Sequence, residues 1–201
     1  DALGAVSLWR GLPDRLCADL KREGLAFDRL GFGKSDPRPA PPGRRFLEVE
    51  ARERLPEVLR QAGVERPILF GHSDGGSIAL LFAAAFPDVP AAVVSIAAHV
   101  LVEEITLAGI DETVAAWRST VLPARLGRHH GAKTEAVFRG WSDTWRAPEF
   151  RGFSAVEAIR PLRCPLLVVQ GEKDEYGTLA QVEAIAGAVT GPVRTVVLPG
   201  L

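Results

Sequence analysis

The residues best suited to chemistry form the motif Gly-His-Ser-Asp-Gly-Gly at positions 71–76. The motif follows a short apolar run and opens a longer apolar stretch that ends at Pro87, which predicts a buried strand turning sharply into a helix. Such a turn strains its central residue, and glycines two positions before and after it let the backbone pass. Ser73 would then present its hydroxyl for nucleophilic attack, beside the amides and positive dipole of a helix N-terminus, which suit an oxyanion.

Two interpretations of Ser73 are open at this point. A serine flanked by glycines at this spacing is common, and Ser73 could simply be the N-cap residue of the helix. The predicted strand before it and the predicted helix after it favour the nucleophile. His72 lies inside the same turn, where we expect its side chain to point away from the hydroxyl and to serve in packing.

The elements that position this turn follow an alternating pattern. Apolar residues at helical spacing alternate with short β-branched runs, and each run ends in Gly, Asp or Pro. This alternation is typical of an α/β fold, in which a mostly parallel sheet has helices on both faces. We predict helices at residues 6–20, 46–63, 73–86 and 178–189, and strands at residues 25–27, 67–71, 91–98, 165–170 and 193–198.

The pattern changes between residues 100 and 160, where short helical pieces carry a concentration of aromatic side chains. We predict a helical cap inserted between a first core segment, residues 1–99, and a second core segment, residues 161–201. The aromatic side chains either line a pocket for an apolar or aromatic group or form the core of the cap itself, and the sequence favours neither interpretation.

Two further motifs make the sequence resemble the α/β-hydrolase superfamily over nearly its whole length. Residues 27–35 are similar to the family's loop after its fourth strand, a tight turn that shapes the floor of the site. Residues 166–174 are similar to its seventh strand and the turn that follows, which implies that Asp174 is the triad acid. Glu172 and Glu175 are neighbouring competitors, and a turn or helix-capping role for Asp174 is the alternative.

The resemblance also implies the other parts of the site. The first residues are similar to the loop after the family's third strand, so the backbone amides of Ala2 and Asp74 would bind the oxyanion. His99 follows a predicted strand near the expected top of the site. With Trp141 and Trp145 of the predicted cap, it would contact the substrate.

The triad base is not found at the position that the family implies. The family's order is Ser, acid and then His, but the four histidines, at positions 72, 99, 129 and 130, all precede Asp174. We therefore expect the base to follow Leu201, and the first strands of the sheet to precede Asp1, in a longer natural protein. The adjacent histidines 129 and 130 lack a third ligand at a spacing suited to a metal, and no cofactor is expected.

These residues predict a serine hydrolase that acts on a small apolar or aromatic carboxylic ester, or on a related acyl substrate, through a Ser-Asp-His triad. Family members with an aspartate nucleophile are excluded because Ser73 occupies that place. The same fold could also serve a non-catalytic protein that binds a small ligand, which is the alternative.

Composition argues against several other classes. The 201 residues are 47% hydrophobic and 24% charged, which suits a folded core. A formal charge of −1 without a basic stripe argues against nucleic acid, and the longest apolar run, nine residues, is too short to cross a membrane. Because the start shows no leader pattern and Cys17 and Cys164 lie in unrelated contexts, we expect a cytoplasmic protein with reduced thiols.

Overall fold

The computed structural model describes residues 1–201, which form two compact units. The sheet unit comprises residues 1–2, 43–112 and 145–201, and the helical unit comprises residues 3–42 and 113–144. The middle of the predicted insertion therefore belongs to the helical unit, whereas its two ends belong to the sheet unit.

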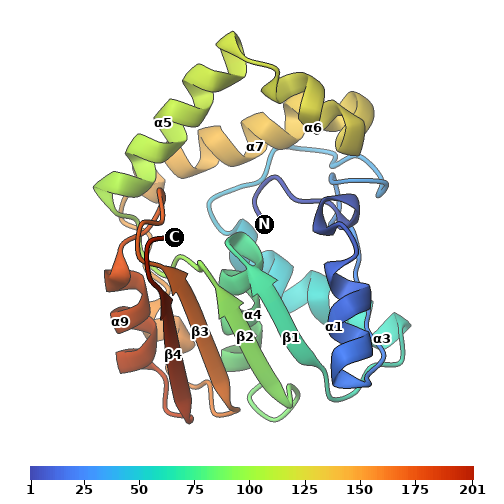
Figure 1. The fold of residues 1–201 in the computed structure, drawn as a ribbon, viewed down its shortest axis with the longest axis vertical. Helices are drawn as coiled ribbons and strands as arrows, with labels where there is room; N and C mark the ends of the chain where they lie inside the picture. Colours follow the sequence, from blue (N-terminus) through green and yellow to red (C-terminus); the bar gives the residue numbers. More distant parts are fainter. The chain divides into compact units, whose positions relative to one another are not determined.

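A four-stranded parallel sheet forms the centre of the sheet unit (Figure 1). Its strands lie in chain order: β1 (Ile68–His72), β2 (Ala92–Ile96), β3 (Leu166–Gly171) and β4 (Val193–Leu198). All four confirm predicted strands to within two residues at each end. Because the strands run in the same direction, their carboxyl ends lie at one edge of the sheet, which is where parallel sheets carry their sites.

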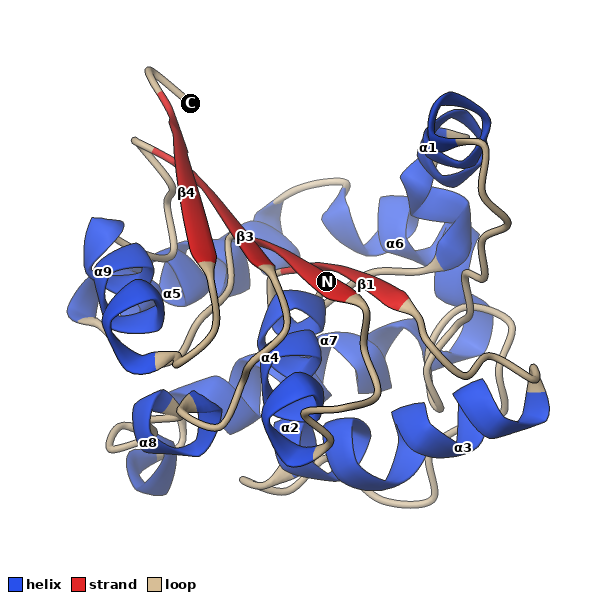
Figure 2. Ribbon diagram, turned by 90° about the horizontal axis from the view of Figure 1, so that it is seen from below, coloured by secondary structure: helices blue, strands red, loops and turns tan.

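Within the sheet unit, helices pack on one face of this sheet, so the prediction of helices on both faces is not confirmed there. Figure 2 shows α4 (Asp74–Ala85), α8 (Val156–Ile159) and α9 (Leu179–Ala188) on the same side of the strands. The other helical elements with residues in this unit are α2 (Phe46–Val49), η2 (Glu50–Arg54), α3 (Leu55–Gln61), η4 (Pro148–Phe150) and parts of α5 (Glu104–Ser119) and α7 (Thr134–Arg146). The helices predicted at 46–63, 73–86 and 178–189 are thus confirmed.

Helix α4 is apolar on all sides and is correspondingly buried. Ten of its twelve residues are buried, among them Leu80 and Phe82, which are 0% and 1% exposed. A helix without a polar face has to be enclosed by other elements, and α4 packs against β1, β2, η2 and α8. Helix α4 is therefore fixed by the elements around it, and it supports the turn at Ser73.

The opposite face of the sheet is also apolar but more open. Side chains along a strand alternate between the two faces. Leu69 and Val93 are paired in register and are buried, whereas Ile68 and Phe70 point the other way and are 44% and 37% exposed. Strand β1 is also an edge strand, since β2 is its one neighbour in the sheet.

The helical unit contains η1 (Val6–Trp9), α1 (Leu12–Leu20), α6 (Leu122–His130) and η3 (Gly131–Lys133), besides parts of α5 and α7. The helix predicted over residues 6–20 is interrupted, because Arg10 and Gly11 both have left-handed backbone, with φ of 48° and 73°. Within this unit the rings of Trp117 and Phe138 stack with their centroids 4.0 Å apart.

The strand predicted at residues 25–27 is wrong. These residues have no regular secondary structure, and Leu25 and Phe27 are 52% and 39% exposed. A strand forms only where a neighbouring strand takes up its backbone hydrogen bonds, and the helical unit contains no other strand. A short apolar run is therefore not sufficient to predict a strand.

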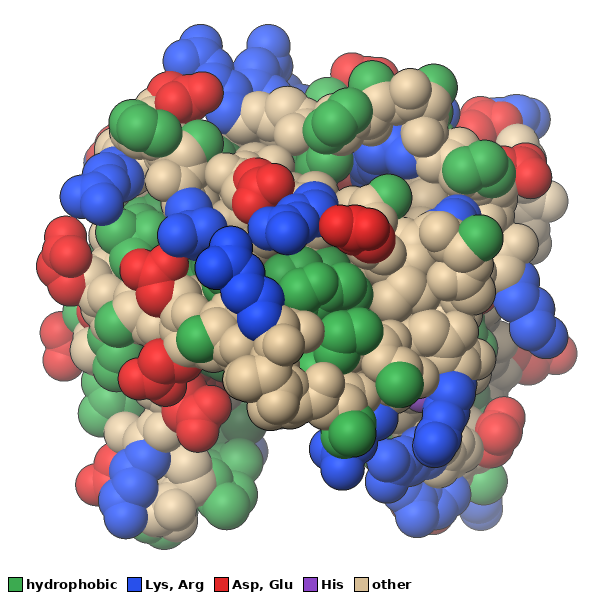
Figure 3. All heavy atoms as spheres, turned by 90° about the horizontal axis from the view of Figure 1, so that it is seen from above, with side chains coloured by type: hydrophobic (Ala, Val, Ile, Leu, Met, Phe, Trp, Pro, Cys, Tyr) green, Lys and Arg blue, Asp and Glu red, His purple; other side chains and the backbone are tan.

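None of the helices has the length and hydropathy that a membrane crossing requires. Acidic and basic side chains both occur over the face drawn in Figure 3, in keeping with a formal charge of −1.

Candidate active site

Ser73 stands at a strained turn between β1 and α4. Its backbone has φ 54° and ψ −126°, a conformation that residues other than glycine rarely adopt. Strain of this kind costs about 1–3 kcal/mol and persists only where the surroundings impose it. The sharp strand-to-helix turn predicted from the motif is therefore present at Ser73.

The turn is possible because Gly71 has no side chain. A Cβ at position 71 would overlap the carbonyl of Gly75 and lie 2.6 Å from the nitrogen of Gly76. A Cβ at position 76 would in turn lie 2.9 Å from both the Ser95 hydroxyl and the Ala98 methyl. The first turn of α4 thus packs directly on the last residues of β1, which is what forces the chain through the conformation of Ser73.

We expect Gly71→Ala to lower the free energy of unfolding by about 3 kcal/mol, because the added methyl group meets backbone atoms that cannot move aside cheaply. Urea denaturation monitored by circular dichroism measures this. The matched control is Gly187→Ala in α9, where a Cβ meets no atom within 4 Å. Equal stability of the two variants would show that the turn is not constrained as described.

The Ser73 side chain does not cap the helix. Ser73 is the N-cap residue of α4 by position, but its hydroxyl makes no capping hydrogen bond. Its backbone is held on both sides: the amide donates to the carbonyl of Ile96 (2.8 Å), and the carbonyl accepts from the amides of Gly76 (2.8 Å) and Ser77 (3.1 Å). The alternative of a plain capping serine is therefore wrong, and the hydroxyl is available for another role.

The first two residues of the chain lie against this turn. The backbone nitrogen of Asp1 donates to the carbonyl of His72 (2.6 Å), and a Cβ at Gly75 would lie 3.2 Å from the same nitrogen. Ala2 and Asp74 are 6% and 3% exposed. The structure thus brings together the segment of Ala2 and the residue after Ser73, the two places from which oxyanion amides are predicted.

Asp174 forms a tight turn directly after β3. Its Oδ1 accepts hydrogen bonds from the amides of Tyr176 (2.8 Å) and Gly177 (3.1 Å). The side chain does not cap the following helix, because Thr178 does so by accepting from the amide of Ala180 (3.1 Å). Oδ1 is therefore fixed by two amides, whereas Oδ2 makes neither of these bonds. This arrangement suits a carboxylate that orients a histidine side chain.

The competing glutamates are placed differently. Glu172 is exposed, and its Oε2 accepts from the amide of Gly200 (2.8 Å). Glu175 is also exposed, whereas Asp174 is half-buried. Of the three acids after β3, Asp174 is the one held by the turn itself.

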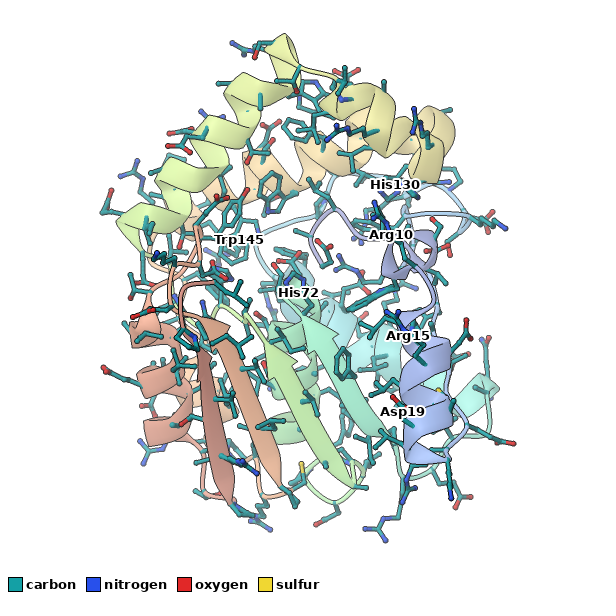
Figure 4. The ribbon with its side chains drawn as sticks, in the orientation of Figure 1. Arg10, Arg15, Asp19, His72, His130 and Trp145 are labelled. Carbon is teal, nitrogen blue, oxygen red and sulfur yellow. The ribbon has the colours of Figure 1, made fainter.

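Ser73 and Asp174 follow strands that both neighbour β2. His72 is in register with Ile96, and Ile96 is in register with Val169, so the two strand ends are separated by two strand spacings, about 10 Å. Burial lowers the pKa of His72, and the carboxylates of Asp174 and Asp74 act in the opposite direction. Asp174 therefore lies within electrostatic reach of His72, which Figure 4 shows at the carboxyl end of β1.

The aromatic residues predicted to contact substrate fall into two groups. His99 and Trp145 belong to the sheet unit, where their rings meet edge to face at 5.5 Å and are 5% and 2% exposed. Trp141 belongs to the helical unit, where it meets Phe138 edge to face at 5.9 Å. Substrate contact by these three residues remains a prediction.

The tight turn predicted within residues 27–35 is present in the helical unit. Gly31 and Gly33 have φ of 90° and 47°, and a Cβ at Gly33 would overlap the carboxylate of Asp28. That carboxylate accepts from the amides of Val6 (2.7 Å) and Lys34 (2.9 Å). Asp28 therefore braces the loop.

Sequence reasoning missed the role of His130, which is 2% exposed in the helical unit. Its Nδ1 accepts from the amide of Gly33 (3.0 Å), and its Nε2 donates to the carbonyl of Leu3 (3.0 Å). Lys133 adds a hydrogen bond to the carbonyl of Gly33 (2.9 Å). One neutral imidazole thus ties the end of α6 to the residue after Ala2, a contact across more than one hundred positions that no local pattern indicates.

Burial lowers the pKa of His130. The hydrogen bond to the Leu3 carbonyl raises this pKa, but by a smaller amount. The unfolded chain binds the proton at this imidazole more readily than the folded chain does. The contribution of neutral His130 to the free energy of unfolding should therefore be fully present above the ordinary histidine pKa, about 6.5, and should decrease as the pH falls below it. His72 shifts in the same direction. We therefore expect the free energy of unfolding, measured in urea from pH 7.5 to 5, to fall less steeply in His130→Gln than in the parent protein. Parallel curves would contradict this account of His130.

Comparison with known proteins identifies the fold. A family model described as "alpha/beta hydrolase fold" matches residues 2–154. A curated mouse (Mus musculus) protein, "Serine hydrolase BPHL", is 31% identical over 157 residues, which cover 75% of this chain and 53% of that protein. The chain thus spans about half the length of this relative.

Solved structures agree on the architecture. The 2-hydroxy-6-oxo-6-phenylhexa-2,4-dienoate hydrolase of Rhodococcus sp. strain RHA1 superposes with a TM-score of 0.79 at 15% identity, over 97% of this chain and 77% of that one. An enol-lactonase from Burkholderia xenovorans LB400 gives 0.72 at 18% identity, over 98% and 80%. Likeness at this level of identity concerns the fold alone, and the predicted fold is confirmed.

Proposed function

The chain belongs to the α/β-hydrolase fold family, and on this premise we propose that it is part of a serine hydrolase with Ser73 as its nucleophile. The observation that supports this most directly is the strained backbone of Ser73, whose hydroxyl does not cap the helix. Backbone strain at a glycine-flanked turn between a strand and a helix is typical of a residue that has to project a reactive group.

The reaction proposed is acyl transfer. The Ser73 Oγ attacks the acyl carbon and gives its proton to an imidazole, which returns that proton to the leaving alcohol. Water then hydrolyses the acyl-enzyme by the same route in reverse. Asp174, held through Oδ1, orients the imidazole through Oδ2 and stabilises its charged form. We propose that this imidazole follows Leu201 in the natural protein, since the four histidines at hand precede Asp174.

The oxyanion that forms on the acyl carbonyl needs two donors. We propose the amides of Ala2 and Asp74, which the segment of residues 1–2 and the first turn of α4 bring to the same turn. Asp74 is the first residue of α4, so the helix dipole adds to its amide. Each donor of this kind typically contributes about 3 kcal/mol to transition-state stabilisation.

The substrate class proposed is a small carboxylic ester or related acyl compound with an apolar or aromatic part. The concentration of aromatic residues within 100–160, which we propose as a cap, favours such a substrate, because pockets lined by apolar side chains bind mainly by burial. The curated relative is named a serine hydrolase, and the two similar structures are named a 2-hydroxy-6-oxo-6-phenylhexa-2,4-dienoate hydrolase and an enol-lactonase. These names are compatible with acyl chemistry and do not select one bond type.

A panel of p-nitrophenyl esters of graded acyl length, offered to the full-length protein, tests the proposal. We expect turnover, and covalent labelling by a fluorophosphonate that mass spectrometry locates at Ser73. A protein that binds such esters but neither hydrolyses them nor reacts with the fluorophosphonate would instead be the non-catalytic ligand binder of the same fold.

A further inference from the structure

His99 is a buried histidine whose side chain is already engaged. It is 5% exposed, and its Nε2 lies 2.9 Å from the carbonyl oxygen of Tyr176. Because a carbonyl oxygen can only accept, Nε2 carries the hydrogen and donates it. The rings of His99 and Trp145 meet edge to face, with their centroids 5.5 Å apart. His99 is therefore fixed in one orientation, and its Nε2 is not available as a proton acceptor.

The backbone of His99 is bound to the helix of the nucleophile. The Ser77 hydroxyl, in the second turn of α4, donates to the carbonyl of His99 (2.7 Å) and accepts from its amide (3.1 Å). The amide of Ser77 donates to the carbonyl of Ser73 (3.1 Å). Ser77 is 1% exposed, so these bonds lie in a low-dielectric interior where they are worth more than at the surface.

The acceptor of the His99 side chain belongs to the turn of Asp174. The Tyr176 carbonyl accepts a second hydrogen bond from the Thr106 hydroxyl (2.6 Å), and the Tyr176 amide donates to Asp174 Oδ1 (2.8 Å). A Cβ at Gly177 would lie 3.1 Å from His99 Nε2. The peptide unit after Tyr176 is thus held from outside the turn by His99 and Thr106, and the peptide unit before it is held by Asp174 itself.

We propose that His99 is a positioning residue of the active site, which sets the distance between the nucleophile and the acid. A continuous series of hydrogen bonds runs from Ser73 through Ser77 and His99 to Tyr176 and ends on the carboxylate of Asp174. This inference rests on the proposed function, because it matters for catalysis only if Ser73 and Asp174 belong to one triad. It gives His99 a role behind the acid instead of in contact with the substrate.

His99→Phe tests the inference in the full-length enzyme, because it keeps an aromatic ring against Trp145 but removes the donor. A shift of about 1 Å in a catalytic group can cost roughly 100-fold in rate. We therefore expect kcat to fall between about 10-fold and 100-fold with KM little changed. The acidic limb of the pH profile of kcat/KM should also move to lower pH, because a displaced carboxylate stabilises the imidazolium less. His99→Gln, whose amide can place a donor near the same carbonyl, should restore most of the rate.

A second pair of variants perturbs the same carbonyl from another side. Thr106→Val removes the other hydrogen bond to Tyr176, and Thr106→Ser keeps it. We expect the valine variant to move the pH profile in the same direction, and the serine variant to leave it in place. These two variants decide the matter if His99→Phe fails to fold. Hydrogen exchange of peptides covering residues 174–178 should quicken in the variants that lose the donor.

The outcomes separate the two proposals. If His99→Phe and Thr106→Val fold and keep the parent kcat and pH profile while Ser73→Ala is inactive, the positioning role is wrong and the nucleophile assignment stands. If kcat falls without a change in the pH profile and His99→Gln gives no rescue, His99 has a merely structural role and the inference is overturned. If Ser73→Ala remains active, the proposed function itself has failed.

Discussion

Replacing Ser73 with alanine should reduce kcat/KM of the full-length protein for its best ester by about 10⁴-fold to 10⁶-fold, because it removes the hydroxyl that we propose forms the acyl-enzyme. Alanine keeps a Cβ and therefore keeps the backbone strain at φ 54°. The thermal unfolding midpoint should stay close to that of the parent protein. Steady-state kinetics and circular dichroism together separate loss of chemistry from loss of fold.

Two companion variants make this result specific. Ser73→Gly should be equally inactive but more stable by about 1 kcal/mol, because glycine relieves the strain. Ser7→Ala removes another serine hydroxyl that is paired with an imidazole, since Ser7 Oγ lies 2.7 Å from His129 Nδ1. We expect Ser7→Ala to leave turnover within about twofold. If Ser7→Ala lost activity while Ser73→Ala kept it, Ser7 and not Ser73 would be the nucleophile.

The parts of the site that the sequence could predict are those built from neighbouring residues. The turn at Ser73 depends on Gly71, Gly75 and Gly76, which lie within three positions of it. The turn at Asp174 likewise closes on the amides of Tyr176 and Gly177. Residue types at fixed short spacing determine such geometry, because sterics and hydrogen bonds act within the same few peptide units.

The parts that could not be predicted depend on partners far along the chain. Residues 25–27 have the composition of a strand but lack a neighbouring strand in their unit, and composition says nothing about neighbours. His99 and His130 are held by the carbonyls of Tyr176 and Leu3, at separations of 77 and 127 positions. A histidine in the sequence gives no sign of which distant carbonyl it binds. Sequence reasoning therefore identified the candidate catalytic residues Ser73 and Asp174, but it did not identify the contacts by which His99 and His130 are held.

Asp174→Asn should lower kcat by about 10⁴-fold while the turn after β3 persists. The asparagine Oδ1 can still accept the amides of Tyr176 and Gly177, so the fold of the turn does not require the charge. At the position of Oδ2, however, asparagine presents an NH₂ donor where the imidazole needs an acceptor. The imidazole would then be held in the wrong tautomer, with its charged form no longer stabilised.

Glu172→Gln and Glu175→Gln are the matched controls for Asp174→Asn, because each removes one charge from the same loop. Both side chains are exposed, and the bond of Glu172 to the Gly200 amide can be made by a glutamine oxygen. We expect kcat within about twofold of the parent for both, since exposed charges are screened by solvent. A loss in Glu172→Gln as large as in Asp174→Asn would mean that general charge, and not the held carboxylate of Asp174, supports the reaction. Full activity in Asp174→Asn would remove the acid from the mechanism, and with it the reason for the chain of hydrogen bonds through His99.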